Sequence, residues 1–429
     1  MKQFKSLGIC LLLLGAFHAT AQTEAVPVFK GAVKSGREKI YNDIIKFGIN
    51  KNLSLPLADS TEENWESAFD DLELINYKEP WVNDKIRMAF DGIENRSIDF
   101  QRSLLEMLYA LNNKGFIAPV NKLLQQTANA KIFAMCGEYL ILCKAVTPQV
   151  LAIVKSKSQK MLSDNDEKIN TIIACFMTSL SHAQSKRNTA LPVKDCLDKK
   201  YLRNNVVLYS IQRKNRNYPG IVIVKDGNGN FVRDDNGNIF SVPQLARSIA
   251  NLPSYLTNGN TPQGIFRMHG FEVSRSQALG PTQNIQLTMP YETSVQHFLN
   301  DSSIADTGWT IERYKELLPG SWKKNFSAYE TYYASKAGRT EIIAHGTTVD
   351  PDFYKGQPYY PHTPTEGCLC TKEIWSAVDG KRTESNQQKL VDAVKKAGGP
   401  DGYLIVVEID DQQKPVSLNE ILPYLKASK

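Results

Sequence analysis

Residues 344–348 read Ala-His-Gly-Thr-Thr, and residues 362–368 read His-Thr-Pro-Thr-Glu-Gly-Cys. A short apolar run, residues 342–344, ends just before His345, and Cys368 follows a glycine. The loop between this histidine and this cysteine has 22 residues. A histidine after a strand-like run and a cysteine in a later loop are typical of a general base and its nucleophile. We therefore interpret the rest of the chain as the scaffold of this pair.

A cysteine and a histidine together suit acyl transfer for a chemical reason. A thiol with an ordinary pKa of about 8.5 is only a few per cent thiolate at neutral pH. A neighbouring imidazole takes the thiol proton, and a third group, often a backbone carbonyl, fixes the tautomer of the imidazole. Gly367 lets the backbone come close to a substrate, so that N–H groups point at a developing oxyanion. One such donor contributes about 100- to 1,000-fold in rate.

Length and composition are those of an ordinary globular protein. The chain has 429 residues, of which 42% are hydrophobic and 22% are charged. At about 150 residues per domain, two or three domains are expected. The net charge of +6 is spread along the chain without a long basic run. We therefore expect no nucleic-acid partner.

Residues 1–21 have the pattern of a secretory signal peptide. Lys2 and Lys5 precede an apolar run over residues 7–17, and Ala-Thr-Ala at residues 19–21 matches a cleavage site. An uncleaved membrane anchor is the alternative, but the run is shorter than the ~20 residues that span a bilayer. The mature protein is expected to be periplasmic or secreted, with no transmembrane segment after cleavage.

Six cysteines remain after the signal peptide. Export favours disulfides for an even number of cysteines, but a core of this size does not depend on them. Cys136, Cys143 and Cys175 lie in apolar helical patterns, so we expect buried free thiols there. Cys368 and Cys370 lie in a loop rich in Gly, Pro and Thr.

The chain divides into a helical part and a strand-rich part, which makes the fold class α+β. Residues 38–186 show consecutive short helical patterns, and we assign residues 22–200 to an α-helical domain. Its helix pairs are either a HEAT-like repeat stack or an irregular bundle. Short β-branched runs at residues 206–209 and 221–224 open a mostly β domain over residues 201–429. The turn at residues 226–230 favours a hairpin over a calcium loop.

Three short motifs in the strand-rich part resemble a known family. Thr-Pro-x-Gly-x-Phe at residues 261–266, His-Gly-Thr at residues 345–347 and Thr-x-Gly-Cys at residues 365–368 occur in the same order as in the L,D-transpeptidase (YkuD-type) catalytic domain. The resemblance covers residues 204–410 and does not extend to the helical region.

The resemblance implies an enzyme that acts on peptidoglycan stem peptides without metal or cofactor. A cysteine attacks the carbonyl of the third residue of a stem tetrapeptide and expels the terminal D-alanine. The acyl group then passes to an amine of a second stem or a protein, or to water. Carried over by position, Cys368 is the nucleophile and His345 the base. A carbonyl near Gly346 or Thr347 would orient His345, and N–H groups around Gly367 and Cys368 would form the oxyanion hole.

The same carry-over assigns substrate contacts to His362, Thr365, Glu366 and Thr347. Two positions depart from the family pattern, and the loop between His345 and Cys368 is a few residues longer than expected. Glu366 stands where the family commonly has histidine, and Cys370 stands where it commonly has arginine. A carboxylate beside the thiol is expected to raise its pKa. Loss of the arginine removes a bidentate anion ligand, so the substrate could differ.

Residues 280–339 form a long insertion between the motifs. A helix is expected at residues 309–318, followed by the aromatic residues Tyr329, Tyr332 and Tyr333. The insertion is either a lid or wall of the substrate site, or a satellite subdomain away from it.

Four alternatives to the main hypothesis stay open. His269 could replace His345 as the base. His345 and His362 could form a zinc site with Cys368 and Cys370, although one residue between two cysteine ligands is tighter than usual. The protein could also be a hydrolase of the L,D-carboxypeptidase type, or bind the cell wall without catalysis. A catalytic Cys368 is expected to react with iodoacetamide well below pH 8.

Overall fold

The computed structural model describes residues 26–163, 165–185, 190–305 and 308–426. The signal peptide expected over residues 1–21 lies outside the described residues. The architecture is α+β, with helices in the N-terminal part and one large mixed sheet in the C-terminal part. This coarse fold class agrees with the sequence prediction. Within the described residues, no helix combines the length and apolar character that a membrane crossing requires.

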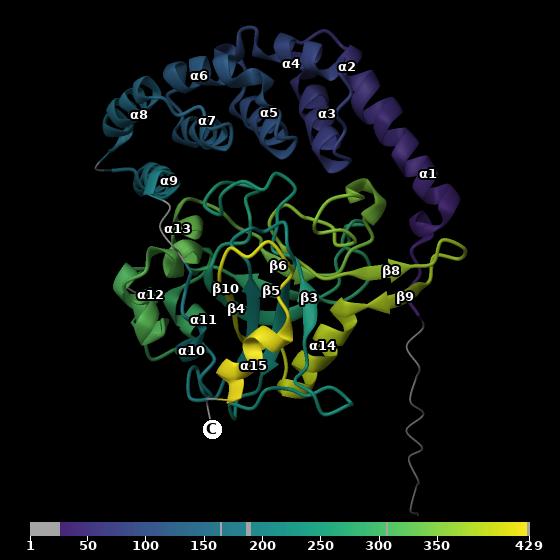
Figure 1. Cartoon of the computed structure of the whole chain (residues 1–429), viewed down its shortest axis with the longest axis vertical. Coiled ribbons are helices and arrows are strands. Elements are labelled where there is room, and N and C mark those ends of the chain that lie inside the picture. The colour runs from purple at the N-terminus through teal and green to yellow at the C-terminus, as the bar shows by residue number, and fades with distance from the viewer. Residues whose placement is uncertain (1–25, 164, 186–189, 306–307, 427–429) are drawn as a thin grey trace, which may run out of the picture.

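The N-terminal helices form a curved row that arches over one end of the sheet (Figure 1). Their apolar residues recur at helical spacing and are buried, as at Phe100, Leu104 and Leu108. Polar caps begin several of them: the Ser97 side chain accepts the Phe100 N–H at 3.0 Å. The expected run of consecutive helices is confirmed. The helices are α1 (Lys34–Asp43), α2 (Asn52–Ser54), α3 (Glu62–Leu74), α4 (Val82–Phe90), α5 (Ile98–Ala110), α6 (Ile117–Gln126), α7 (Ala130–Leu142), α8 (Pro148–Met161) and α9 (Glu167–Ser185).

The large sheet has eight strands in the order β3-β2-β1-β10-β4-β5-β6-β7. The pairs β1 with β10 and β6 with β7 are parallel, and the other pairs are antiparallel. The strands are β1 (Val206–Gln212), β2 (Gly220–Lys225), β3 (Val242–Gln244), β4 (Gly264–Glu272), β5 (Asn284–Thr288), β6 (Ile343–His345), β7 (Leu369–Cys370) and β10 (Asp401–Glu408). The expected strands at residues 206–209 and 221–224 are therefore confirmed as parts of β1 and β2.

The sheet curls until its two ends meet. Leu245, which directly follows β3, forms an antiparallel bridge with Cys370 of β7. Each of the two residues donates its N–H to the carbonyl of the other at 2.8 Å. A sheet that closes in this way has few unpaired strand edges. The domain is nearly barrel-shaped, and Cys370 lies at its seam.

The two faces of the sheet pack into different cores. Val206 and Leu208 of β1 belong to one core, whereas Val207 and Tyr209 belong to the other, as strand alternation requires. The first core is covered by α14 (Asn386–Ala397), which contacts β2, β3 and β5. The second core is covered by the helices α10 (Val193–Cys196), α11 (Val295–Leu299), α12 (Ile311–Leu317), α13 (Glu330–Lys336) and α15 (Leu418–Lys426).

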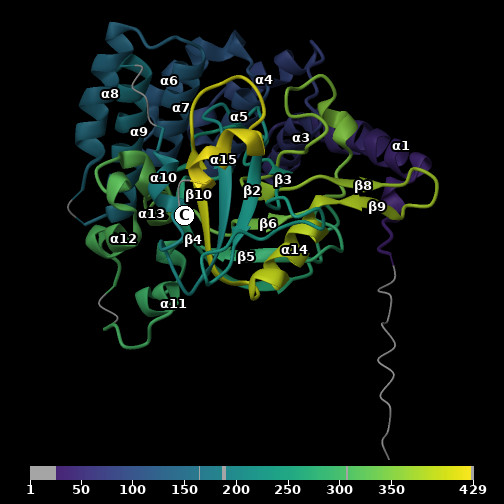
Figure 2. The ribbon, with the colours of Figure 1, turned by 60° about the horizontal axis from the view of Figure 1, so that its bottom comes forward.

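A small hairpin ties the start of the chain to the sheet domain. β8 (Glu373–Trp375) and β9 (Arg382–Ser385) pair with each other and extend toward α1 (Figure 2). Val28 bridges to Lys381, and the Lys34 N–H donates to the Ala377 carbonyl at 2.9 Å. The first described residues therefore pack against the sheet domain, although the sequence analysis assigned them to the helical domain.

The helical arch and the sheet domain share one hydrophobic core. Leu252 and Leu256, from the loop before β4, are buried with the residues of the helices. Tyr255 donates its hydroxyl to the Glu138 carboxylate at 2.8 Å. The arch is therefore a fixed cover of the loops that precede β4.

Two boundaries expected from the sequence need correction. The helical domain was expected to end at residue 200, but α10 packs in the sheet-domain core with Val193 and Cys196. Residues 280–339 were expected to be an insertion, but β5 lies within them and is an inner strand of the sheet. Tyr329 and Tyr332 are buried in that core, so they provide packing.

The structure contains the expected turn at residues 226–230 and free cysteines in the helices. At residues 226–230 the Asp226 N–H donates to the Asn230 carbonyl at 2.8 Å, which confirms the hairpin. All six cysteines after residue 25 are free. Cys136 and Cys175 are buried as expected, whereas Cys143 is half-buried.

Candidate active site

The parallel pair β6 and β7 brings His345, the last residue of β6, close to Cys368, the residue before β7. In the register, Ala344 lies opposite Leu369 and His345 lies opposite Cys370. Ala344 and Leu369 point into the core of the sheet. Because side chains alternate along a strand, His345 and Cys370 point to the other face, and Cys368 directly precedes β7. The Ile343 N–H donates to Cys368 Sγ at 3.5 Å, which fixes the thiol beside β6.

His345 is buried, and a backbone carbonyl of the next residue holds its ring. Nδ1 is hydrogen-bonded to the carbonyl of Gly346. Because a carbonyl only accepts, the proton lies on Nδ1 and the lone pair lies on Nε2. Burial lowers the pKa of His345 to about 4, and the bond to the Gly346 carbonyl opposes this shift. At neutral pH the imidazole is therefore uncharged and able to accept a proton at Nε2.

The Cys368 thiol is half-buried and protonated at neutral pH. Burial raises the pKa of Cys368 to about 11. The Ile343 N–H and the Arg339 guanidinium lower this pKa, whereas the carboxylates of Glu366 and Glu341 raise it. The sequence predicted that the Glu366 carboxylate raises the thiol pKa, and the structure agrees with that direction. Any nucleophilic attack by this thiol would therefore require a base to remove its proton, and iodoacetamide reactivity well below pH 8, which the sequence predicted for a catalytic Cys368, is not expected from this environment.

Hydrogen bonds join two of the sequence motifs directly. Thr261 donates its hydroxyl to the Gly367 carbonyl at 2.8 Å. Thr365 Oγ1 accepts the Gly367 N–H at 3.0 Å and donates to the Cys368 carbonyl at 2.9 Å. Gly367 has φ +113°, which favours glycine. Thr261 and Thr365 therefore set the shape of the loop before the thiol.

These bonds change the assignment of the oxyanion donors. The Gly367 N–H is already bonded to Thr365. Within the described part of the chain, no hydrogen bond is found from the Cys368 N–H. The expected pair of donors is thus reduced to the Cys368 N–H. The Thr365 hydroxyl, expected to contact substrate, is used twice inside its own loop.

The other expected substrate residues lie in three different places. Glu366 is exposed beside the thiol. Thr347 is buried, and its N–H is bonded to Glu373. His362 lines a hollow of about 990 Å³ together with Pro243 and Lys372, and that lining includes neither His345 nor Cys368. The structure therefore brings Glu366 to the thiol and places His362 elsewhere.

Arg339 is a site residue that the sequence analysis missed. Its side chain is buried and donates to the backbone carbonyls of Ser254, Gly259 and Asn260. Burial lowers the pKa of Arg339 to about 10. Its positive charge lowers the pKa of the Cys368 thiol and so stabilises the thiolate. Arg339 lies 29 residues before Cys368 in the chain, and no local motif gives a signal for its role.

The helical arch faces the site loop with acidic residues. Burial raises the pKa of Asp70 and Glu73, and the charge of Glu366 adds to both shifts. Both residues lie on α3, so the charge of Glu366 acts on this helix of the arch. Asn258 also donates to Glu106 of α5 at 3.2 Å.

The zinc and His269 alternatives lack support in this geometry. The parts of the chain that the structure describes contain no group of three or more His, Cys, Asp or Glu residues arranged to hold a metal ion. Nδ1 of His345 and Nδ1 of His362 are both bonded to backbone carbonyls. His269 lies beside His297, with ring centroids 6.1 Å apart, near the end of β4.

No family model, no curated protein and no solved structure matches the chain.

The carboxylate of Glu366 gives a testable pH effect. In Glu366→Gln the negative charge beside Sγ is lost, so the thiolate becomes less unfavourable and the thiol pKa falls. Alkylation of Cys368 by iodoacetamide, followed against pH by mass spectrometry, is expected to shift to lower pH. Glu316→Gln, an exposed change on α12, is the control and should leave the profile unchanged. An unchanged profile in Glu366→Gln would contradict the electrostatic account of this thiol.

Proposed function

We propose that this protein is an exported cysteine acyltransferase of the L,D-transpeptidase type that acts on peptidoglycan stem peptides. The observation that carries the proposal is the arrangement on β6 and β7. Cys368 directly precedes β7 and its Sγ accepts the Ile343 N–H of β6, the strand that ends at His345, and the His345 ring is held by the Gly346 carbonyl with Nε2 left as acceptor. The bond from Thr261 to Gly367 supports it further, because it joins residues 106 positions apart that both belong to the resembling motifs.

In the proposed first half-reaction, Cys368 Sγ attacks the carbonyl carbon of the third stem residue and a C–S bond forms. The thiol proton passes to Nε2 of His345. The Cys368 N–H donates to the oxyanion of the tetrahedral intermediate. The C–N bond to the terminal D-alanine then breaks, and His345 returns its proton to the leaving amine. The product is a thioester on Cys368.

The second half-reaction passes the acyl group to an acceptor. An amine of a second stem or of a protein attacks the thioester carbonyl, and His345 takes the amine proton. A new amide bond forms and the Cys368 thiol is regenerated. With water as the acceptor, the same residues would give a hydrolase of the L,D-carboxypeptidase type.

Intact-protein mass spectrometry tests the nucleophile. The protein without residues 1–21 is incubated with peptidoglycan fragments that carry tetrapeptide stems, or with a carbapenem. Carbapenems acylate members of the L,D-transpeptidase family, which this chain resembles. We expect a mass adduct on the wild type and none on Cys368→Ala. Cys370→Ala removes a buried thiol two residues away and is expected to keep the adduct.

The outcome that contradicts the proposal is equally definite. If the wild type forms no adduct with either reagent while Cys368 alkylates as an ordinary thiol, the protein is not an acyltransferase. The remaining hypothesis would then be a cell-wall binding protein without catalysis. If an adduct forms, its products with and without an added amine distinguish transfer from hydrolysis.

A further inference from the structure

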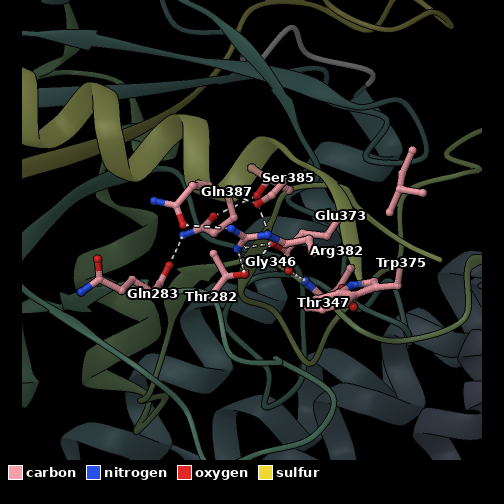
Figure 3. A network of polar contacts seen from close by, with 12 residues as sticks. Thr282, Gln283, Gly346, Thr347, Glu373, Trp375, Arg382, Ser385 and Gln387 are labelled. Atoms are coloured by element: carbon pink, nitrogen blue, oxygen red, sulfur yellow. Dashed lines mark hydrogen bonds and ion pairs between the residues drawn. The ribbon is translucent and has the colours of Figure 1, made fainter. Parts of the chain in front are cut away.

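A buried carboxylate lies directly behind the loop that follows His345. Glu373 begins β8 and is almost inaccessible to solvent, with 6% of its surface exposed. Oε1 accepts the hydroxyl of Thr282 at 2.6 Å and the hydroxyl of Ser385. Arg382 Nη1 lies 3.6 Å from the same oxygen. Figure 3 shows these groups converging on one carboxylate.

The second oxygen of this carboxylate holds the catalytic loop. Oε2 accepts the Thr347 N–H at 3.1 Å. That N–H belongs to the same peptide unit as the Gly346 carbonyl, which is bonded to His345 Nδ1. A peptide unit is planar, so fixing its N–H also fixes the direction of its carbonyl. The contact from Glu373 is therefore transmitted through one rigid plane to the imidazole.

Two further features restrict the backbone at this peptide and at the peptide that follows it. A Cβ on Gly346 would overlap the Glu373 carboxylate, so the residue after the histidine has to be glycine for this approach. Trp375, two residues further along β8, donates its Nε1–H to the Thr347 carbonyl at 2.8 Å. β8 thus holds Thr347 from both its N–H and its carbonyl (Figure 3).

The charge of Glu373 suits this position. Burial raises the pKa of Glu373, whereas the bonds from Ser385, Thr282 and Thr347 and the charge of Arg382 all lower it. Burial is the largest of these effects, so the pKa of Glu373 lies above its ordinary value. In its ionised form the carboxylate accepts from Thr282, Ser385 and the Thr347 N–H at its two oxygens. A negative charge on the N–H side of a peptide polarises its carbonyl, and a polarised carbonyl is a stronger acceptor for Nδ1–H.

We propose that Glu373 is a positioning residue for His345, which acts through the Gly346–Thr347 peptide to keep the proton on Nδ1 and the base at Nε2. The inference rests on the proposed function for its role in acyl transfer. The effect of Glu373 on the His345 tautomer does not depend on any reaction. The positioning role of Glu373 and the proposed acyl transfer can therefore be contradicted by separate results.

The test combines a spectroscopic and a kinetic measurement on Glu373→Gln. Glutamine has nearly the same shape, and the hydroxyls of Thr282 and Ser385 can rotate to accept from its amide. In ¹⁵N spectra of histidine-labelled protein at neutral pH, the wild type is expected to show His345 as the Nδ1–H tautomer, and Glu373→Gln a mixture of tautomers. The maximal rate of Cys368 acylation by a carbapenem is expected to fall about 100-fold, as for a displaced catalytic group, with the concentration for half-maximal rate unchanged.

Glu384→Gln is the matched control, because Glu384 lies on the same hairpin and pairs with Lys372 at 3.3 Å. It should alter neither measurement. Trp375→Phe, which keeps the ring but loses the bond to Thr347, should shift the His345 signals in the same direction, and it replaces Glu373→Gln if that variant does not fold.

An unchanged His345 spectrum in Glu373→Gln overturns the inference, whether or not acylation falls, because a fall alone would be a general structural effect. If the wild type itself is not acylated, the proposed function fails, while the spectra still decide the role of Glu373.

Discussion

Gly367→Ala is expected to unfold at a markedly lower temperature than the wild type and to lose acylation at Cys368. Gly367 has φ +113°, a conformation that an L side chain rarely adopts. A Cβ at this position would overlap the Arg339 guanidinium and the Gly259 carbonyl, both of which are buried in the loop packing. The backbone strain alone costs about 1–3 kcal/mol, and the overlap adds to it because Arg339 has no room to retreat.

Gly356→Ala separates the backbone strain from the steric overlap with Arg339 and Gly259. Gly356 also has a positive φ, +88°, but a Cβ added there would have no other atom within 4 Å. This control therefore carries only the strain. Thermal unfolding and carbapenem acylation of both variants give the comparison. If Gly367→Ala is no less stable than Gly356→Ala and acylates at the wild-type rate, the packing of Arg339 against Gly367 has no importance.

Arg339→Met is expected to have the second large effect, on stability and on the thiol together. The three carbonyls that accept hydrogen bonds from Arg339, those of Ser254, Gly259 and Asn260, would lose their donor inside the protein. Leaving such groups unpaired costs about 1–3 kcal/mol each, so the total loss is on the order of 3 kcal/mol or more. The thiolate of Cys368 would also lose a nearby positive charge, so the thiol pKa rises. Urea unfolding and the pH dependence of alkylation measure the two effects.

Arg339→Lys distinguishes charge from geometry. Lysine keeps the positive charge but lacks the planar fork that reaches several carbonyls. We expect Arg339→Lys to lose stability while its alkylation profile stays closer to that of the wild type. A profile in Arg339→Met identical to the wild type would show that this guanidinium does not act on Cys368.

Local patterns in the sequence were sufficient to predict the consecutive helices and the strands β1 and β2, and to select His345 and Cys368 as a candidate pair. Helical periodicity identified the arch, because an apolar face at 3.6-residue spacing depends only on neighbouring residues. The turn at residues 226–230 followed from its Asp, Asn and Gly residues for the same reason. His345 and Cys368 were recognised because each carries its chemistry together with an adjacent glycine.

Segment boundaries were less accessible to such patterns. β5 is a short strand within residues 280–339, and its place in the sheet depends on pairing with β4 and β6. α10 is short, and whether it belongs to the arch or to the sheet domain depends on which core receives Val193 and Cys196. Neither pairing nor core membership is encoded in the nearest residues.

The sequence by itself determined the division into helices and strands and selected Cys368 and His345 as the candidate nucleophile and base. Only the tertiary structure decided how that pair is tuned. Arg339 reaches the Gly259 carbonyl across 80 residues of chain, and Glu373 reaches the Thr347 N–H across 26. Burial, which raises the thiol pKa and lowers the imidazole pKa, is a property of the assembled cores. Contacts and desolvation of this kind arise only when distant segments pack together, and for that reason no local sequence motif predicts them.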